Sequence, residues 1–181
     1  MSSPRPEEYD PSMKRTSFAN WPCSVARTMN LLGDWWTPLV LREAFYGISR
    51  FDQFQGELGI ARNTLTDRLN HLVEYELLRK EQYQVDPVRY EYVLTEKGKD
   101  FYPVLAAMSA WGDRWLDKGA GPPIVFHHRS CDHDVTAEVV CSHCKEPLQA
   151  DDVEHRIGPG YPARIAELPQ VKARFDAQRL G

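Results

Sequence analysis

The chain has 181 residues, of which 42% are apolar, so it is long enough for one ordinary domain with a small appendage, or for two small domains. Its formal net charge of −4 excludes the overall basic composition of many nucleic-acid-binding domains. It has neither an apolar run of the ~20 residues needed to span a bilayer nor an apolar secretory start, so we expect a cytoplasmic protein without membrane contact.

The N-terminal part of the chain shows a polar segment followed by two helical patterns. Residues 1–20 are polar and contain three prolines, which predicts a disordered arm. Apolar residues from Val25 to Leu32 have the spacing of one helix face, and Gly33 ends this segment. Thr37-Pro38 is typical of an N-cap with proline at the first helical position, so we expect a second helix that ends at Gly47.

The next segment has the pattern of a helix-turn-helix. Ser49 and Asp52 resemble a capping box, with Asp in place of the usual Glu or Gln, and predict a short helix that ends at Gly59. A longer helix with a leucine stripe is expected from Ala61 to Glu76. Two helices separated by so short a turn indicate a helix-turn-helix.

After the second of these helices the apolar period changes from 3.6 to 2. This change predicts two strands, 78–83 and 89–94. Thr95 is expected to cap a final long helix that is broken or kinked near Pro103. Together the patterns predict an α+β, mainly helical fold: a winged helix-turn-helix over 21–119 with a long C-terminal helix, and a small β-rich appendage over 120–181.

Several motifs, in order and at their spacing, resemble the HxlR-type family of regulators over roughly residues 21–116. They are Cys23–Arg27, Leu32–Thr37, Arg50-Phe51, Ile60–Leu69 and Tyr92–Gly98. The resemblance implies a homodimeric, cytoplasmic bacterial regulator that binds double-stranded DNA. Its recognition helix would enter the major groove and its wing would contact flanking phosphates. Ala61 departs from the family pattern, because many members have an N-capping serine there.

Candidate DNA contacts lie on the helix face opposite the leucine stripe and on the hairpin. Asn63 has the groups to read adenine, and Asp67 has an acceptor for the cytosine amino group. The full set of candidates is Arg62, Asn63, Thr64, Asp67, Arg68 and His71 on the helix, with Arg79, Lys80 and Arg89 on the hairpin. We assign Arg62 and Arg68 to phosphates. The alternative is a solvated helix face and ordinary surface charge.

Cys23 is a candidate redox sensor. It follows Pro22 at the start of a helix, with Arg27 one turn later, and both surroundings favour a thiolate. Some HxlR-type members sense oxidants or electrophiles through a cysteine at the matching position, although here Ser24 replaces the proline common in the family. The alternative is a buried, inert cysteine.

The other three cysteines predict a structural zinc site in the appendage. Cys141-Ser142-His143-Cys144 has the spacing with which two sulfurs bind one ion, and Cys131 and His133 would complete a tetrahedral Cys3His set. The histidines at 127, 128 and 143 are substitutes for His133. A small β module without metal is the alternative.

These features predict a repressor or activator that binds a pseudo-palindromic operator as a homodimer through its first and last helices. The input would be an unknown small-molecule effector, Cys23 chemistry or metal occupancy. A zinc enzyme is disfavoured, because four protein ligands leave no open coordination position and the usual catalytic motifs are absent. A winged-helix protein-interaction module, or a zinc-dependent sensor without specific DNA binding, is kept open by the net negative charge.

Overall fold

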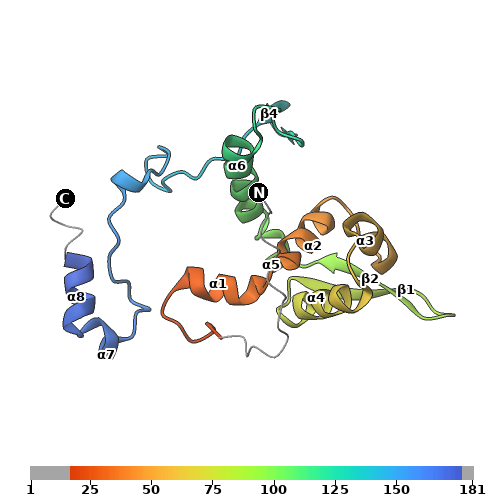
Figure 1. Ribbon diagram of the computed structural model, residues 1–181, viewed down its shortest axis with the longest axis horizontal. Coiled ribbons are helices and arrows are strands. Elements are labelled where there is room, and N and C mark those ends of the chain that lie inside the picture. The colour runs from red at the N-terminus through yellow and green to blue at the C-terminus, as the bar shows by residue number, and fades with distance from the viewer. Residues whose placement is uncertain (1–16, 177–181) are drawn as a thin grey trace, which may run out of the picture. The chain divides into compact units, whose positions relative to one another are not determined.

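The computed structural model describes residues 17–176, drawn in colour in Figure 1. These residues belong to two units, one up to Gly33 and one from Asp34 onward. The predicted disordered arm lies outside the described residues except for residues 17–20. Among the described residues, no helix combines the length and apolar character that crossing a membrane requires.

The first unit contains the predicted first helix, α1 (Ser24–Leu32). Cys23 is its N-cap, and the backbone N–H of Ala26 donates to the Cys23 sulfur at 3.5 Å. Gly33 ends the helix with φ 70° and donates to the carbonyl of Met29. Both ends of the predicted helix are therefore confirmed.

The second helix, α2 (Trp36–Phe45), begins earlier than predicted. The Asp34 carboxylate accepts hydrogen bonds from the backbone N–H groups of Trp36 and Thr37, at 2.9 and 3.1 Å. Thr37 is a fully buried residue of the first turn and not the cap. The prediction of a Thr37-Pro38 cap was wrong because the Asp34 side chain satisfies the N–H groups that a cap must satisfy.

The predicted helix-turn-helix is present as α3 (Phe51–Leu58) and α4 (Arg62–Glu74). Gly59 ends α3 in the left-handed region, with φ 59°, where a glycine has no steric cost. The expected Ser49 cap is wrong by one residue. The backbone N–H of Arg50 donates to the Gln53 side chain, while the Ser49 hydroxyl donates to Glu91 at 3.0 Å.

Ala61 is the N-cap of α4 and gives this helix no side-chain hydrogen bond. Its extended backbone, with φ −61° and ψ 139°, is suited to a capping side chain. We expect Ala61→Ser to raise the free energy of unfolding by about 1 kcal/mol, measured from the denaturant midpoint. Ala61→Val is the control, since it adds no acceptor and should give no gain. Equal midpoints for serine and valine would contradict this N-cap geometry.

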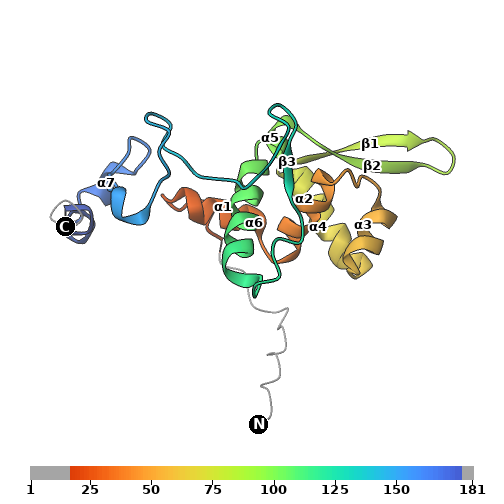
Figure 2. The ribbon, with the colours of Figure 1, turned by 90° about the horizontal axis from the view of Figure 1, so that it is seen from above.

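The wing is the antiparallel hairpin of β1 (Leu78–Gln84) and β2 (Arg89–Leu94), as predicted. Leu78 pairs with Leu94 at its base, and the register shifts between Gln82 and Gln84. Figures 1 and 2 both show the hairpin extending past the helix-turn-helix. Residues 49–50 add a short third segment: Arg50 pairs with Glu91, and the N–H of Tyr92 donates to the carbonyl of Ser49 at 2.7 Å.

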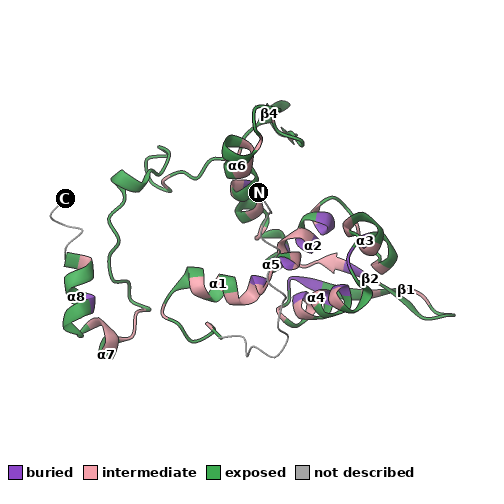
Figure 3. Cartoon of the chain, in the orientation of Figure 1, coloured by how far each residue is buried: buried purple, intermediate pink, exposed green. Residues whose placement is uncertain are grey.

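The core lies where α2, α3, α4 and the base of the hairpin meet. Its most completely buried apolar side chains are Val40, Leu41, Phe54, Leu65, Leu69, Leu72, Leu77 and Leu78. Figure 3 shows the buried residues concentrated in these elements. The leucine stripe of α4 is thus used for packing, which leaves the opposite face of that helix for a partner.

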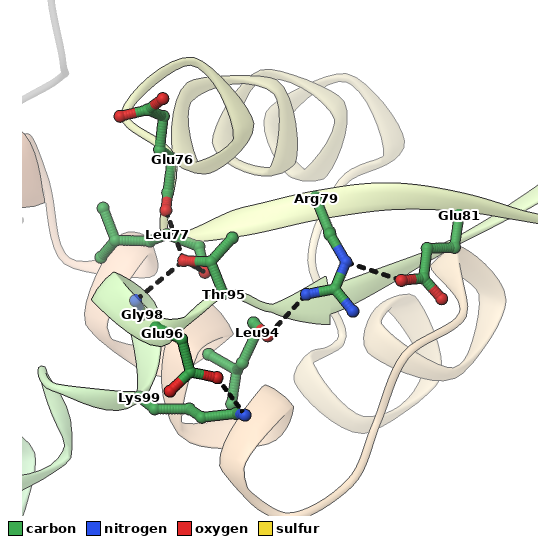
Figure 4. A network of polar contacts seen from close by, with 9 residues as sticks. All are labelled: Glu76, Leu77, Arg79, Glu81, Leu94, Thr95, Glu96, Gly98 and Lys99. Carbon is green, nitrogen blue, oxygen red and sulfur yellow. Dashed lines mark hydrogen bonds and ion pairs between the residues drawn. The ribbon is translucent and has the colours of Figure 1, made fainter.

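The expected long helix after Thr95 is divided into α5 (Glu96–Lys99) and α6 (Tyr102–Leu116). The Thr95 cap is confirmed, since its hydroxyl accepts from the N–H of Gly98 at 3.0 Å and donates to the carbonyl of Glu76, as Figure 4 shows. Pro103 lies in the first turn of α6, where a missing N–H costs no helical bond. Of the break or kink predicted near Pro103, the structure has the break, between Lys99 and Tyr102.

The appendage holds a second antiparallel hairpin, β3 (Phe126–His128) with β4 (His133–Val135), and a single bridge between Val140 and Pro147. A 3₁₀ turn and two helices follow: Ala150–Asp152, α7 (Ala163–Ala166) and α8 (Pro169–Asp176). Of the described residues beyond 120, Val171 alone is buried. The appendage therefore has very little apolar core to hold it together.

Candidate nucleic-acid interface

The face of α4 opposite the core presents polar side chains to solvent. Arg62, Asn63 and Asp67 are exposed, while the leucines at 65, 69 and 72 on the other face are fully buried. The Arg62 guanidinium lies over the Phe51 ring of α3, 5.0 Å from its centroid. Asn63 lies within α4, one residue after its first. These three candidates are placed where a ligand can reach them.

Two other candidates on α4 are only half-exposed. Thr64 lies at the edge of the exposed face. His71, in the last turn, packs its ring against Tyr75 at 4.6 Å between centroids. A contact from His71 to DNA stays a prediction.

Arg68 has a different environment from the exposed phosphate contact that we expected. Its guanidinium is 2.7 Å from the Asp34 carboxylate, and the two side chains are only 17% and 15% exposed. Asp34 also caps α2, so a single carboxylate joins the start of α2 to the middle of α4. We therefore assign Arg68 to positioning α4 against the start of α2. Its sequence position alone did not reveal its distant partner.

The stem of the hairpin holds two of the predicted cations in partnered positions. Arg79 forms an ion pair with Glu81 at 2.6 Å and donates to the carbonyl of Leu94, as Figure 4 shows. Lys80 donates to the Asn70 side chain of α4 at 3.2 Å and lies 5.5 Å from the centroid of the Tyr92 ring. Lys80 thus links the hairpin to α4. The charge of Arg79, in contrast, is compensated by Glu81.

Two exposed cations lie farther out on the wing side. Arg89 begins β2, directly after the loop of residues 85–88. Arg50 was not among the predicted contacts, although it is part of the Arg50-Phe51 motif. Its guanidinium lies over the Tyr83 ring of β1, 4.5 Å from the centroid, so it belongs to the same surface as the wing.

Cys23 is exposed, so the alternative of a buried cysteine is wrong. Arg27, expected to stabilise its thiolate, donates to the carbonyl of Trp21 and to the Ser24 hydroxyl. The redox-sensing role of Cys23 stays a prediction.

The predicted zinc ligands lie on two turns of the appendage. Cys131 lies in the β3–β4 turn and His133 begins β4, whereas Cys141 and Cys144 lie in the turn after Val140. Hydrogen bonds from the backbone N–H of Cys144, then of His143, and from the Cys144 thiol lower the pKa of Cys141. Within residues 17–176, the structure does not bring three His, Cys, Asp or Glu side chains together in a metal-binding arrangement.

An open groove lies between α6 and the β3–β4 hairpin, lined by residues that include Asp113, Ile124 and Val135. Its volume of about 180 Å³ is below the range of about 300–1,000 Å³ that is typical of ligand pockets. This groove therefore gives no support to the predicted small-molecule effector.

Comparison with known proteins identifies the class of protein to which this chain is similar. The family model described as HxlR-like helix-turn-helix matches residues 31–120. An uncharacterised HTH-type transcriptional regulator of Mycobacterium tuberculosis, Rv3095, is 43% identical over 143 residues, which are 79% of this chain and 90% of that protein. A second uncharacterised HTH-type transcriptional regulator, sll1512 of Synechocystis, is 38% identical over 97 residues. These residues are 53% of this chain and 72% of that protein.

Solved structures agree with these relatives. The crystal structure of PA1607, a candidate transcription factor, is 33% identical with a TM-score of 0.70, and covers 80% of this chain and 99% of that chain. A candidate transcription factor of Pseudomonas aeruginosa, PA1374, is 34% identical with a TM-score of 0.54, covering 84% and 99%. Because the 143 residues aligned with Rv3095 outnumber residues 1–120, the similarity includes part of the appendage. Proteins of this class regulate transcription and are not enzymes.

Proposed function

Because this chain belongs to the HxlR-like helix-turn-helix family of transcriptional regulators, we propose that it binds a pseudo-palindromic DNA operator as a homodimer. The observation that carries the proposal is the exposed polar face of α4 next to a hairpin with exposed cations. Helices of this kind enter the major groove, and the hairpin contacts the flanking backbone.

Asn63 and Asp67 are the proposed base-reading residues. They lie four residues apart on one exposed face, which separates them by about 6 Å along the helix. Base pairs are about 3.4 Å apart, so both side chains would face the same short stretch of DNA. Asn63 would pair with adenine and Asp67 would accept from a cytosine amino group.

The proposed phosphate contacts are Arg50, Arg62, Lys80 and Arg89. Three of them lie over aromatic rings of neighbouring elements, which limits their motion and keeps their charge at the surface. A protein with a net charge of −4 is able to bind DNA when its cations are gathered on one face, because only local charge meets the phosphates. A dimer would offer this cation set twice.

The dimer proposal is supported by an apolar stripe on α6. Val104, Met108, Trp111 and Trp115 recur at the spacing of one helix face, and all four are exposed. An exposed apolar face of this kind marks an interaction site. A second copy of the chain is the occupant we propose, because a two-fold protein matches a palindromic operator. Oxidation at Cys23 or a small effector would act by changing the separation of the two α4 helices.

Arg89→Ala tests both DNA binding and the role of the wing. The operator would first be selected from a random DNA library, and its affinity measured by fluorescence anisotropy over a series of salt concentrations. We expect the variant to bind all sequences more weakly, and the slope of log affinity against log salt to flatten by about 2, because a dimer loses two phosphate contacts. Arg79→Ala is the control, since Glu81 compensates that charge and the slope should change less.

Two results would contradict this assignment. A loss of affinity confined to one base position would make Arg89 a base-reading residue. Absence of salt-dependent binding to any selected DNA would overturn the proposed function and favour a winged helix that binds proteins instead.

A further inference from the structure

The appendage contains two turns with the same local design, which the proposed function does not use. Each turn places two potential metal ligands three positions apart, followed at once by a non-glycine residue with positive φ. The two sets are His128, Cys131 and Asp132, and Cys141, Cys144 and Lys145. The φ values of Asp132 and Lys145 are 58° and 67°. Both turns are closed by antiparallel pairing, of β3 with β4 and of Val140 with Pro147.

These left-handed residues are costly in so exposed a module. A non-glycine residue in this region costs about 1–2 kcal/mol, and such strain persists where the surroundings hold it in place. The side chains of Asp132 and Lys145 are exposed, and residues 121–148 contain no buried residue. Apolar packing therefore does not hold these two turns in place, and a metal bound by the residues just before them would do so. Modules this small commonly depend on a metal or a disulfide.

The first turn already holds a nitrogen and a sulfur at a separation that suits one ion. The His128 Nδ1 atom is 3.2 Å from the Cys131 sulfur. Two such atoms on a tetrahedral zinc, with bonds of about 2.0 and 2.3 Å, would lie about 3.5 Å apart. The backbone holds the turn closed, since Asp132 donates to the carbonyl of His128 at 2.9 Å.

The neighbouring histidines are engaged elsewhere. His133, the ligand expected from the sequence, directs its Nδ1 to the carbonyl of Cys131. His127 has one ring nitrogen 3.0 Å from Asp134 and the other 3.2 Å from Asp132. The His128 ring also contacts the Ser130 hydroxyl, but of the histidines in this hairpin it is the one with a ring nitrogen against the Cys131 sulfur.

The second turn is closed by backbone hydrogen bonds at Cys141. The backbone N–H of Cys141 donates to the carbonyl of Glu146 at 2.8 Å. The backbone N–H of Lys145 donates to the carbonyl of Cys141 at 3.0 Å. This closed turn carries Cys141 and Cys144 three positions apart, the spacing with which two sulfurs bind one ion.

We propose that His128, Cys131, Cys141 and Cys144 bind one structural zinc ion that joins the two turns. The two pairs lie on separate turns, and the connection between them, residues 136–139, has no regular secondary structure, so binding would require this connection to bring the turns together. Binding releases three thiol protons to solvent, and neutral His128 supplies the fourth ligand. Four protein ligands close the coordination sphere, so the ion is structural and not catalytic. This inference does not depend on DNA binding.

The test uses the reduced full-length protein titrated with Zn²⁺ alone, and with Co²⁺ to record the absorption of tetrahedral cobalt–thiolate bonds. We expect one ion per chain. His128→Ala and Cys131→Ser should each weaken zinc binding by at least about 100-fold, whereas His133→Ala should leave it within a few-fold. Cys23→Ser is the matched cysteine control, and it should retain both the affinity and the cobalt spectrum.

The outcomes distinguish the proposed site from a site with other ligands, a site between two copies and no site at all. Loss of binding in His133→Ala but not in His128→Ala would overturn the ligand assignment. One ion per two chains would place the metal between copies, which also contradicts the proposal. Failure of the full-length protein to bind either ion would overturn the site altogether. Because the readout is metal binding, each result holds whether or not the protein binds its operator.

Discussion

Replacing Gly98 with alanine should lower the free energy of unfolding by about 3 kcal/mol. A Cβ atom at this position would lie 2.1 Å from the backbone oxygen of Leu77 and 3.1 Å from the Leu94 side chain. The first neighbour is backbone at the base of β1, so the clash cannot be relieved by a rotamer change, and overpacking of this kind costs about 1–3 kcal/mol. Gly98 also donates to the Thr95 cap within the network of Figure 4. The measurement is a denaturant midpoint at constant slope.

Gly56→Ala is the matched control for this variant. Gly56 lies within α3, and an added Cβ there would meet no atom within 4 Å. We expect this substitution to stabilise the protein by up to about 1 kcal/mol, because alanine is the better helix former. If Gly98→Ala were as stable as Gly56→Ala, the close approach of α5 to the base of β1 would not exist in solution.

Local sequence signals were sufficient for the helix-turn-helix and the wing. The alternation of residues 78–83 and 89–94 predicts strands because one face must be buried, and the structure buries Leu78 and Tyr92. Gly59 marks the turn because its backbone conformation is costly for other residues. Such features depend on neighbours within a few residues, so they are readable from sequence.

Contacts between distant residues could not be predicted in this way. From its helix alone, Arg68 would be a surface cation. In the structure it forms an ion pair with Asp34, which lies 34 positions earlier in the chain. Ser49 looks like a cap until β2 brings Glu91 to it. In both cases the side chain binds a residue from another element instead of a neighbour in its own segment. The partner is therefore known only from the folded structure.

The histidine of the proposed zinc site could not be chosen from the sequence, because that choice depends on side-chain direction. Cys131-x-His133 and His128-x-x-Cys131 are both plausible as sequence patterns. For the proposed site the turn favours the second pattern, because it directs the His133 ring toward a backbone carbonyl and brings the His128 ring to the Cys131 sulfur. Binding of one ion by Cys141 and Cys144 stays a prediction, based on the spacing that allows two sulfurs to meet one ion.

Trp111→Glu should convert the proposed dimer to a monomer and weaken operator binding by at least about 100-fold. Trp111 is 60% exposed and lies at the centre of the apolar stripe of α6, where a tryptophan between two copies would contribute strongly to association. A carboxylate there would be desolvated without a partner, which is costly. Because two linked half-site contacts reinforce each other, loss of the dimer removes a factor of about 10²–10⁴ in affinity. Sedimentation and anisotropy would measure the two effects on the same samples.

Ser109→Glu places the same charge on the same helix away from the stripe, so it should remain dimeric and bind the operator normally. Ser109 is exposed and lies about 130° around α6 from the direction shared by Val104, Met108, Trp111 and Trp115. A Trp111→Glu protein that stayed dimeric would assign the interface to another surface, with the exposed Val25 and Met29 of α1 as the next to be changed. A monomeric variant with full operator affinity would instead show that one α4 helix and one wing are sufficient for binding, which the palindromic arrangement does not allow.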